Sequence, residues 1–285
     1  MKNFFRAGLR VFLFSLFFLS FSCLAPILAS PTVAFSAPSK DAPALYTTLP
    51  WMTNMARFIV GSTMKIQPMS SWNDLGVLKI AKRLPKDAVI IALDPKDAEK
   101  YGLAPDRENI NFLYENLPVS EARRNTLQFD PSALPFLSQR LLVVLSRLQP
   151  NNYSFYQRRL AEFQSRLEST LEVGRIQIHG IKLLDLTEAA SPWLKAASAE
   201  VVRPPADLWD AWSNGDRLQE LALAVGEAQR RGWWIVIDAW TPYRIRAHAI
   251  GARNGVFIKP PQNEEDFFTY LHDIYLQMWN TVGRR

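Results

Sequence analysis

The chain has very little cysteine and histidine, the residues that most often bind transition metals. Cys23 is the only cysteine among 285 residues, and there are three histidines. One cysteine cannot form an intramolecular disulfide, and a site built from several thiolates is excluded. Because 48% of the residues are hydrophobic, the chain can bury a core large enough to fold without disulfides.

The chain also lacks the patterns of nucleic-acid-binding proteins and of common enzymes. Its formal net charge is +6, and three of the basic residues, Lys2, Arg6 and Arg10, lie at the very N-terminus. No basic run with interleaved aromatic residues follows, so nucleic acid is not an expected partner. There is no Gly-x-Ser-x-Gly motif and no phosphate-binding loop, and we expect no catalytic residues.

The N-terminus has the pattern of an export signal. The three basic residues precede an apolar stretch at 11–28, and small residues surround a cleavage position after Ala34. We predict a signal peptide at 1–34 and a linker at 35–43, and hence a periplasmic or otherwise extracytoplasmic protein. A retained membrane anchor is the alternative, because the apolar stretch is nearly long enough to span a bilayer. Lipid attachment at Cys23 is not expected, because Ser20-Phe21-Ser22 is a poor lipidation signal.

After the linker, short apolar runs alternate with helical patterns, which is typical of an α/β fold with mostly parallel sheets. The run AVIIAL at 88–93 is apolar throughout and predicts a strand buried on both faces. We predict strands at 44–48, 64–69, 88–93, 182–186, 200–203, 233–239 and 256–258. We predict helices at 53–60, 74–84, 132–148, 153–172, 188–197, 216–231, 242–253 and 263–282. Leu75, Leu78 and Ala81 give the helical spacing of 74–84, and Asp216 is the expected N-cap of 216–231. The last helix is expected to face inward with Phe267, Tyr270, Leu271, Ile274 and Met278.

The helix after Pro150 is long and amphipathic, with one narrow apolar stripe and Gly174 at its expected end. It separates two strand–helix series. We therefore predict an N-terminal lobe at 44–149, a linking helix at 150–174 and a C-terminal lobe at 175–285, with a ligand cleft between the lobes. In open α/β sheets, ligands bind beyond the carboxyl ends of the strands, so residues that follow strands are the functional candidates.

The order of these segments resembles the solute-binding proteins of zinc and manganese ABC transporters. LYTTLPWMTNMARFIVG is similar to the opening strand, helix and glycine of that family, and the stretch from TLQFDP into the long helix is similar to the one that begins H-x-W-L-D-P. KLLDLTEAA, the segment from WWIVIDAW to FIKPP, and YLHDIYLQMWNTV match its later strands and helices. The resemblance implies two α/β lobes joined by a rigid helix, a bound zinc or manganese ion, an ABC-transporter permease as partner, and a monomer.

The residues that should hold the metal differ from that family. The family uses histidines and a carboxylate, whereas the matching positions here are Thr126, Thr187 and Lys259, and residues 68–76 contain no histidine. His179, His248 and His272 do not follow predicted strands, and we interpret them as surface or packing residues. A lysine would also repel a metal ion. The sequence therefore predicts the family's scaffold with a degenerate or altered metal site, and only the resemblance implies a divalent zinc or manganese ion as cofactor.

The candidate ligand-binding residues of the cleft are Trp72, Asp74, Thr126, Thr187, Asp238 and Lys259. Lys259 could pair with Asp238 and close the lobes, or it could bind an anionic or polar organic solute beside the two threonine hydroxyls. Trp193 and Trp240, with Trp72, could form apolar walls. A residual oxygen-ligand metal site from Asp74, Asp185, Glu188 and Asp238 is a third alternative. An exported interaction protein without a solute is the alternative to a transport function.

Overall fold

The computed structural model describes residues 44–285, apart from 81–87, 105–106, 199 and 283–285. The predicted signal peptide at 1–34, the linker at 35–43 and Cys23 lie outside the described residues. Within the described part of the chain, no helix combines the length and the apolar character needed to cross a membrane.

The first sheet is parallel, with the strand order β2-β1-β5-β6. Its central strand β5 carries the predicted AVIIAL run, and Ile90, Ile91 and Ala92 are fully buried. Apolar side chains on both faces are the reason this strand lies inside the sheet. The bounds are β1 Leu45–Thr47, β2 Ile66–Pro68, β5 Val89–Ala92 and β6 Ile110–Phe112.

The second sheet is also parallel and has the order β10-β9-β7-β8. All five residues of β9 are buried, as the apolar WWIVIDA run predicts. Both sheets belong to one compact unit of the chain. The bounds are β7 Leu183–Asp185, β8 Val201–Val202, β9 Trp234–Asp238 and β10 Gly255–Ile258.

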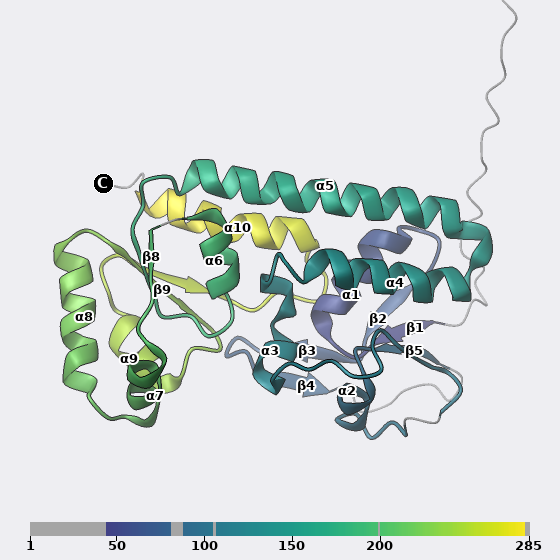
Figure 1. Ribbon diagram of the computed structural model, residues 1–285, viewed down its shortest axis with the longest axis horizontal. Coiled ribbons are helices and arrows are strands. Elements are labelled where there is room, and N and C mark those ends of the chain that lie inside the picture. Colours follow the sequence, from purple (N-terminus) through teal and green to yellow (C-terminus); the bar gives the residue numbers. More distant parts are fainter. Residues whose placement is uncertain (1–43, 81–87, 105–106, 199, 283–285) are drawn as a thin grey trace, which may run out of the picture. The chain divides into compact units, whose positions relative to one another are not determined.

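Helices pack on the two sheets, and the longest of them, α5, runs along both sets of elements (Figure 1). The helix α5 contacts α1 and α4 of the first lobe and α6 and α10 of the second. The α-helices are α1 Pro50–Val60, α2 Pro95–Glu99, α3 Glu121–Asn125, α4 Leu134–Leu148, α5 Tyr153–Gln177, α6 Ser191–Ala197, α7 Ala206–Asn214, α8 Leu218–Arg230, α9 Tyr243–Ala249 and α10 Phe267–Val282. Two 3-10 turns, η1 Leu127–Phe129 and η2 Pro150–Asn152, precede α4 and α5. The predicted α/β fold of two parallel-sheet lobes and one long helix is confirmed.

The C-terminal helix α10 packs against α5 and also contacts α1 and β10. The predicted inward face of Phe267, Tyr270, Leu271, Ile274 and Met278 is buried, which confirms the helical spacing read from the sequence. Phe267 and Phe268 meet Phe163 of α5 at ring-centroid distances of 5.4 and 4.9 Å.

Gly174 does not end α5, because the helix continues to Gln177. The glycine is needed for packing. A methyl group at this position would overlap the ring of Tyr275 in α10, which is fully buried and stacks on Trp193 at 5.6 Å between centroids. The close approach of α5 and α10 therefore explains a residue that the sequence pattern assigns to a helix end.

The predicted helix at 74–84 is wrong over its described part. Residues 70–80 form an antiparallel hairpin of β3 Ser70–Trp72 and β4 Leu78–Ile80. Its turn is stabilised by the Asn73 side chain, which accepts hydrogen bonds from the amides of Leu75 and Val77, and by Gly76 at a φ of +72°. Of the residues that gave the helical spacing, Leu75 is exposed, Leu78 is half-buried in β4, and Ala81 lies outside the described residues. The turn formed by Asn73 and Gly76 therefore determines the local structure, rather than the weak helical spacing of the apolar residues.

A second local prediction is also wrong. Asp216 was expected to cap the helix of 216–231, but α8 begins at Leu218 after Arg217, whose φ is +54°. The Arg217 side chain pairs with Glu220 of the first turn at 2.7 Å. The ion pair and the turn geometry, rather than an aspartate cap, define this helix start.

Candidate functional site

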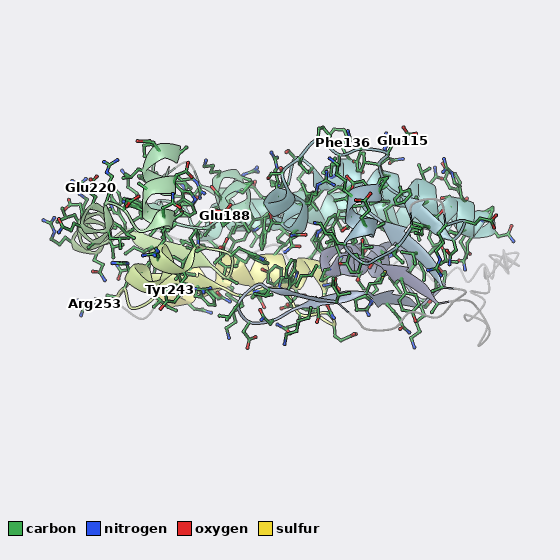
Figure 2. All side chains as sticks on the ribbon, turned by 90° about the horizontal axis from the view of Figure 1, so that it is seen from below. Glu115, Phe136, Glu188, Glu220, Tyr243 and Arg253 are labelled. Carbon is green, nitrogen blue, oxygen red and sulfur yellow. The ribbon has the colours of Figure 1, made fainter. Side chains whose placement is uncertain are left out.

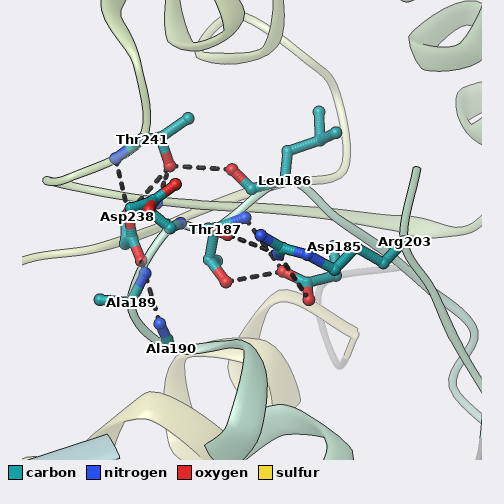
Figure 3. A network of polar contacts seen from close by, with 9 residues as sticks. Asp185, Leu186, Thr187, Ala189, Ala190, Arg203, Asp238 and Thr241 are labelled. Carbon is teal, nitrogen blue, oxygen red and sulfur yellow. Dashed lines mark hydrogen bonds and ion pairs between the residues drawn. The ribbon is translucent and has the colours of Figure 1, made fainter. Parts of the chain in front are cut away.

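The carboxyl ends of β7 and β9 hold two buried aspartates, Asp185 and Asp238. Both are fully buried, and both have their acceptor oxygens occupied by neighbouring groups (Figure 3). The strand-end rule correctly locates polar residues here. Their surroundings, however, are those of structural carboxylates.

Asp238 holds the loop after β7 against the loop after β9. Its two oxygens accept hydrogen bonds from five backbone N–H groups at 2.7 to 3.2 Å. The Thr241 hydroxyl lies 2.9 Å from the same carboxylate and 2.8 Å from the carbonyl oxygen of Leu186. Burial raises the pKa of the Asp238 carboxyl, while the hydrogen bonds from these groups act in the opposite direction. The five donors belong to Glu188, Ala189, Ala190, Trp240 and Thr241.

Thr187 is engaged in a second network and is fully buried. Its amide and hydroxyl donate to Asp185 Oδ1 at 3.0 and 2.6 Å. Arg203 Nη1 donates to the Thr187 carbonyl oxygen at 2.5 Å and to Asp185 Oδ2 at 3.2 Å. The Arg203 guanidinium also lies over the Trp209 ring, with Cζ 4.5 Å from its centroid. Arg203 follows β8, so the strand-end rule could have identified it.

Lys259 does not pair with Asp238, which corrects the internal-pair hypothesis. The two residues lie on neighbouring strand ends, since Ile258 is in register with Asp238, yet Lys259 is exposed and no ion pair joins it to Asp238 within the described chain. The donors around Asp238 are backbone amides instead. The Lys259 carbonyl oxygen accepts a hydrogen bond from the Tyr270 hydroxyl at 2.8 Å. The backbone of Lys259, rather than its ammonium group, is tied to the core.

We therefore expect Lys259→Asp to change the free energy of unfolding by no more than about 0.5 kcal/mol, as is usual for an exposed side chain, since no described residue forms an ion pair with it. Urea denaturation of the variant and the parent protein measures this directly. A loss of several kcal/mol would restore the internal-pair hypothesis.

Two of the three candidate tryptophans meet where the lobes adjoin. Trp240, after β9, lies edge-on to Trp72 of the hairpin at 5.4 Å and to Phe129 of η1 at 5.6 Å between centroids. A methyl group on Gly76 would come within 2.9 Å of Trp240 Nε1, so the hairpin turn also approaches this ring closely. Trp193 is elsewhere, fully buried against Tyr275, and its predicted place on a cleft wall is wrong.

A cavity of about 500 Å³ is lined by residues of both lobes, and we call it the interlobe cavity. Figure 2 shows Glu188, which lines it, between Glu220 of α8 and Phe136 of α4. Of the candidates, only Thr126 lines it directly; Thr187 and Asp238 are buried next to it, and Trp72, Asp74 and Lys259 lie outside its lining. The first lobe contributes Ser120, Arg123, Thr126, Asp130 and Ser132, and the second contributes Glu188, Ala189, Ser191, Pro192 and Arg203.

The interlobe cavity carries charges that the motif comparison did not identify. Arg123 forms an ion pair with Asp130, and the amide and hydroxyl of Ser132 also donate to that carboxylate. Burial of Asp130 acts to raise its pKa, but the Ser132 hydroxyl and Arg123 outweigh it, so the pKa is lowered. Arg123 and Asp130 stand three residues before and four residues after Thr126. Their closeness to Thr126 in the sequence could have identified both as candidate site residues.

The described residues do not form a cluster suited to a metal ion. No group of three or more His, Cys, Asp or Glu side chains in the described part of the chain could hold one. The alternative oxygen-ligand site from Asp74, Asp185, Glu188 and Asp238 is therefore not assembled. The interlobe cavity has two lining carboxylates, Asp130 and Glu188, which are fewer than the four ligands of a zinc site, and a guanidinium group from each lobe lines it as well.

Comparison with solved structures places the chain among known folds. It matches a structure of ZnuA with a TM-score of 0.58 at 13% identity, over 85% of this chain and 99% of that one. A manganese-bound periplasmic metal-binding protein from Candidatus Liberibacter asiaticus matches with a TM-score of 0.56 at 9% identity, over 84% and 99%. The chain has the fold of the periplasmic metal-binding proteins. The predicted resemblance is confirmed at the level of the fold.

The same metal-binding-protein fold occurs in a protein of a second kind. The laminin-binding protein of Streptococcus agalactiae, described as bifunctional with adhesin and metal-transporting activity, matches with a TM-score of 0.54 at 13% identity, over 83% of this chain and 99% of that one. No protein-family model and no curated protein sequence matches the chain. At these identities the comparison establishes the fold alone.

Proposed function

We propose that the protein is an exported solute-binding component of an ABC transporter whose metal site is altered, so that the interlobe cavity takes a polar organic solute. The observation that carries this proposal is the lining of the cavity, which places two arginines and two acidic residues among hydroxyl groups: Arg123, Arg203, Asp130 and Glu188. Zinc requires imidazole, thiolate or carboxylate ligands in a compact set. The two lining carboxylates, Asp130 and Glu188, belong to no group of three or more His, Cys, Asp or Glu side chains among the described residues that could hold a zinc or manganese ion.

The rest of the proposal follows from the fold and the N-terminal pattern. A signal peptide at 1–34 would deliver the chain to the periplasm or another extracytoplasmic space, without a lipid anchor at Cys23. A transporter permease would be its partner, and the protein would act as a monomer with no nucleic-acid partner and no catalytic role. Fold similarity to metal-binding proteins supports this kind of partner.

Ligand-dependent melting tests the proposal. A ligand that binds only the folded state raises the melting temperature. We expect a rise with at least one small organic solute and none with zinc chloride or manganese chloride after removal of bound metal. A rise with either metal salt alone would contradict the altered site.

The second candidate function is an exported interaction protein on the same scaffold. The observation that favours it is that the laminin-binding protein with this fold is described as an adhesin as well as a metal transporter. If neither metals nor solutes raise the melting temperature, the transport proposal fails and the interaction function is the better explanation.

A further inference from the structure

The walls of the interlobe cavity are balanced in charge. Each lobe contributes one arginine and one acidic residue, Arg123 with Asp130 from the first lobe and Arg203 with Glu188 from the second. A bare cation would meet two guanidinium groups, and an inorganic anion would meet two carboxylates. A ligand with one charge of each sign avoids both penalties.

Arg123 is the group best placed to take a carboxylate. Its Nη2 is committed to Asp130, which is itself held by Ser132, so the guanidinium is anchored from one side. The Arg123 side chain nevertheless remains 57% exposed. A guanidinium has five N–H donors and can bind a carboxylate through two of them.

Glu188 is the group best placed to take an ammonium group. Its backbone amide is fixed by Asp238, and its side chain is exposed with no ion pair to any described residue. The charged groups around it are Arg203 from the loop after β8, Asp238 of β9 and Asp210 of α7, and Trp209 of α7 donates a hydrogen bond to its side chain. Partial burial of the carboxyl raises its pKa, and the two aspartates add to this while Arg203 opposes it. A cationic group beside Glu188 would therefore be stabilised.

Arg203 does not compete for the same role, because its guanidinium is already occupied by Asp185, the Thr187 carbonyl oxygen and the Trp209 ring. Ser191 provides an independent sign of a ligand. Its hydroxyl belongs to a residue only 7% exposed that lines the cavity, and it has no hydrogen-bond partner within the described residues. Buried hydroxyl groups rarely remain unpaired in the functional state.

We infer that the interlobe cavity binds a zwitterionic organic solute of amino-acid type, with its carboxylate on Arg123 and its ammonium group on Glu188. The inference rests on the proposed solute-binding function and names its substrate class. A cavity of about 500 Å³ is of the size that accommodates small organic ligands. A neutral sugar would form hydrogen bonds with the hydroxyl groups of the cavity, but it would bring no opposite charge to Glu188 or to the exposed edge of Arg123.

Calorimetric titration with the standard L-amino acids tests the inference. For any amino acid that binds, the same titration is made with its carboxamide, which lacks the carboxylate, and with its N-acetyl form, which lacks the ammonium group. We expect at least one amino acid to bind and both analogues to bind at least about tenfold more weakly, because each loses a charge-assisted hydrogen bond.

Two variants assign the roles, and two exposed residues outside the cavity lining provide matched controls. Glu188→Gln and Arg123→Gln are expected to weaken binding at least about tenfold. Glu115→Gln and Arg253→Gln are expected to leave the affinity unchanged, since both side chains are exposed. Circular dichroism and the melting temperature of each variant establish that it is folded, so that lost binding is not lost structure.

The outcomes separate this inference from the proposed function. Binding of inorganic phosphate, a sugar or zinc without binding of any amino acid would overturn the inference. Sugar binding would leave the organic-solute function in place, whereas phosphate binding would contradict the organic solute and zinc binding would contradict the altered site. Full affinity in Glu188→Gln and Arg123→Gln would overturn the assigned contacts. Absence of binding by every solute would end both proposals.

Discussion

Asp238→Ala is expected to lower the free energy of unfolding by about 3–5 kcal/mol, the largest effect of any single carboxylate in the second lobe. The substitution leaves the buried amides of Ala189 and Ala190 without an acceptor and releases the loop between β7 and α6 from β9. Each unsatisfied buried donor costs about 1–3 kcal/mol. Urea denaturation followed by circular dichroism measures the change.

Asp74→Ala is the matched control, because the Asp74 side chain is exposed on the hairpin turn. Its free energy of unfolding should change by no more than about 0.5 kcal/mol. Asp238→Asn should also be destabilising, since its amide nitrogen would replace an acceptor oxygen that now receives N–H groups. If Asp238→Ala lost less than about 1 kcal/mol, the carboxylate would not be the element that joins these loops.

Gly174→Ala is expected to destabilise the protein by about 1–3 kcal/mol, although alanine favours helices more than glycine does. The added methyl group would overlap the Tyr275 ring, which cannot move aside because it is buried and stacked on Trp193. The contact between α5 and α10 would have to open. Thermal and urea denaturation of the variant measure the loss.

Gly226→Ala is the control, for which we expect the opposite change in the free energy of unfolding. Gly226 lies inside α8, and apart from its chain neighbours and the backbone of its own helix no described atom lies within 4 Å of the position its methyl group would take. Because only helix propensity changes there, we expect stabilisation by about 0.5–1 kcal/mol. Stabilisation by both substitutions would contradict the close packing of α5 on α10.

The features that sequence reasoning predicted correctly are those with a strong physical signal. Continuous apolar runs predicted β5 and β9 as buried parallel strands, and helical spacing predicted the core face of α10. These patterns arise because each side chain on the buried face of a strand or helix is transferred out of water on folding and is therefore apolar. The long helix α5 was predicted for the same reason, although its end was placed at a glycine that serves packing.

The site was predicted less well because side-chain direction depends on neighbours that the sequence does not reveal. Side chains of a strand point alternately to its two faces, and in β10 Val256 and Ile258 point to the buried one. Lys259 follows this alternation and therefore lies on the same, more exposed face as Phe257. The sequence predicts Asp238 as a ligand-binding residue of the cleft. In the structure its carboxylate accepts hydrogen bonds from backbone amides instead, including one from Glu188, fifty residues away in the chain. Arg123 and Arg203 were not identified, because motif matching singled out Thr126 and Thr187 and passed over their neighbours.

Metal content measures the central claim most directly, namely that this metal-binding-protein fold does not hold a metal ion in its interlobe cavity. The protein is purified without chelator, incubated with excess zinc and manganese, desalted and subjected to element analysis. Because the cavity lining offers only two carboxylates and no metal-suited cluster occurs among the described side chains, we expect far less than one equivalent of either metal per chain. Close to one equivalent of zinc or manganese, retained by the parent protein and lost on substitution of a residue lining the cavity, would contradict the account.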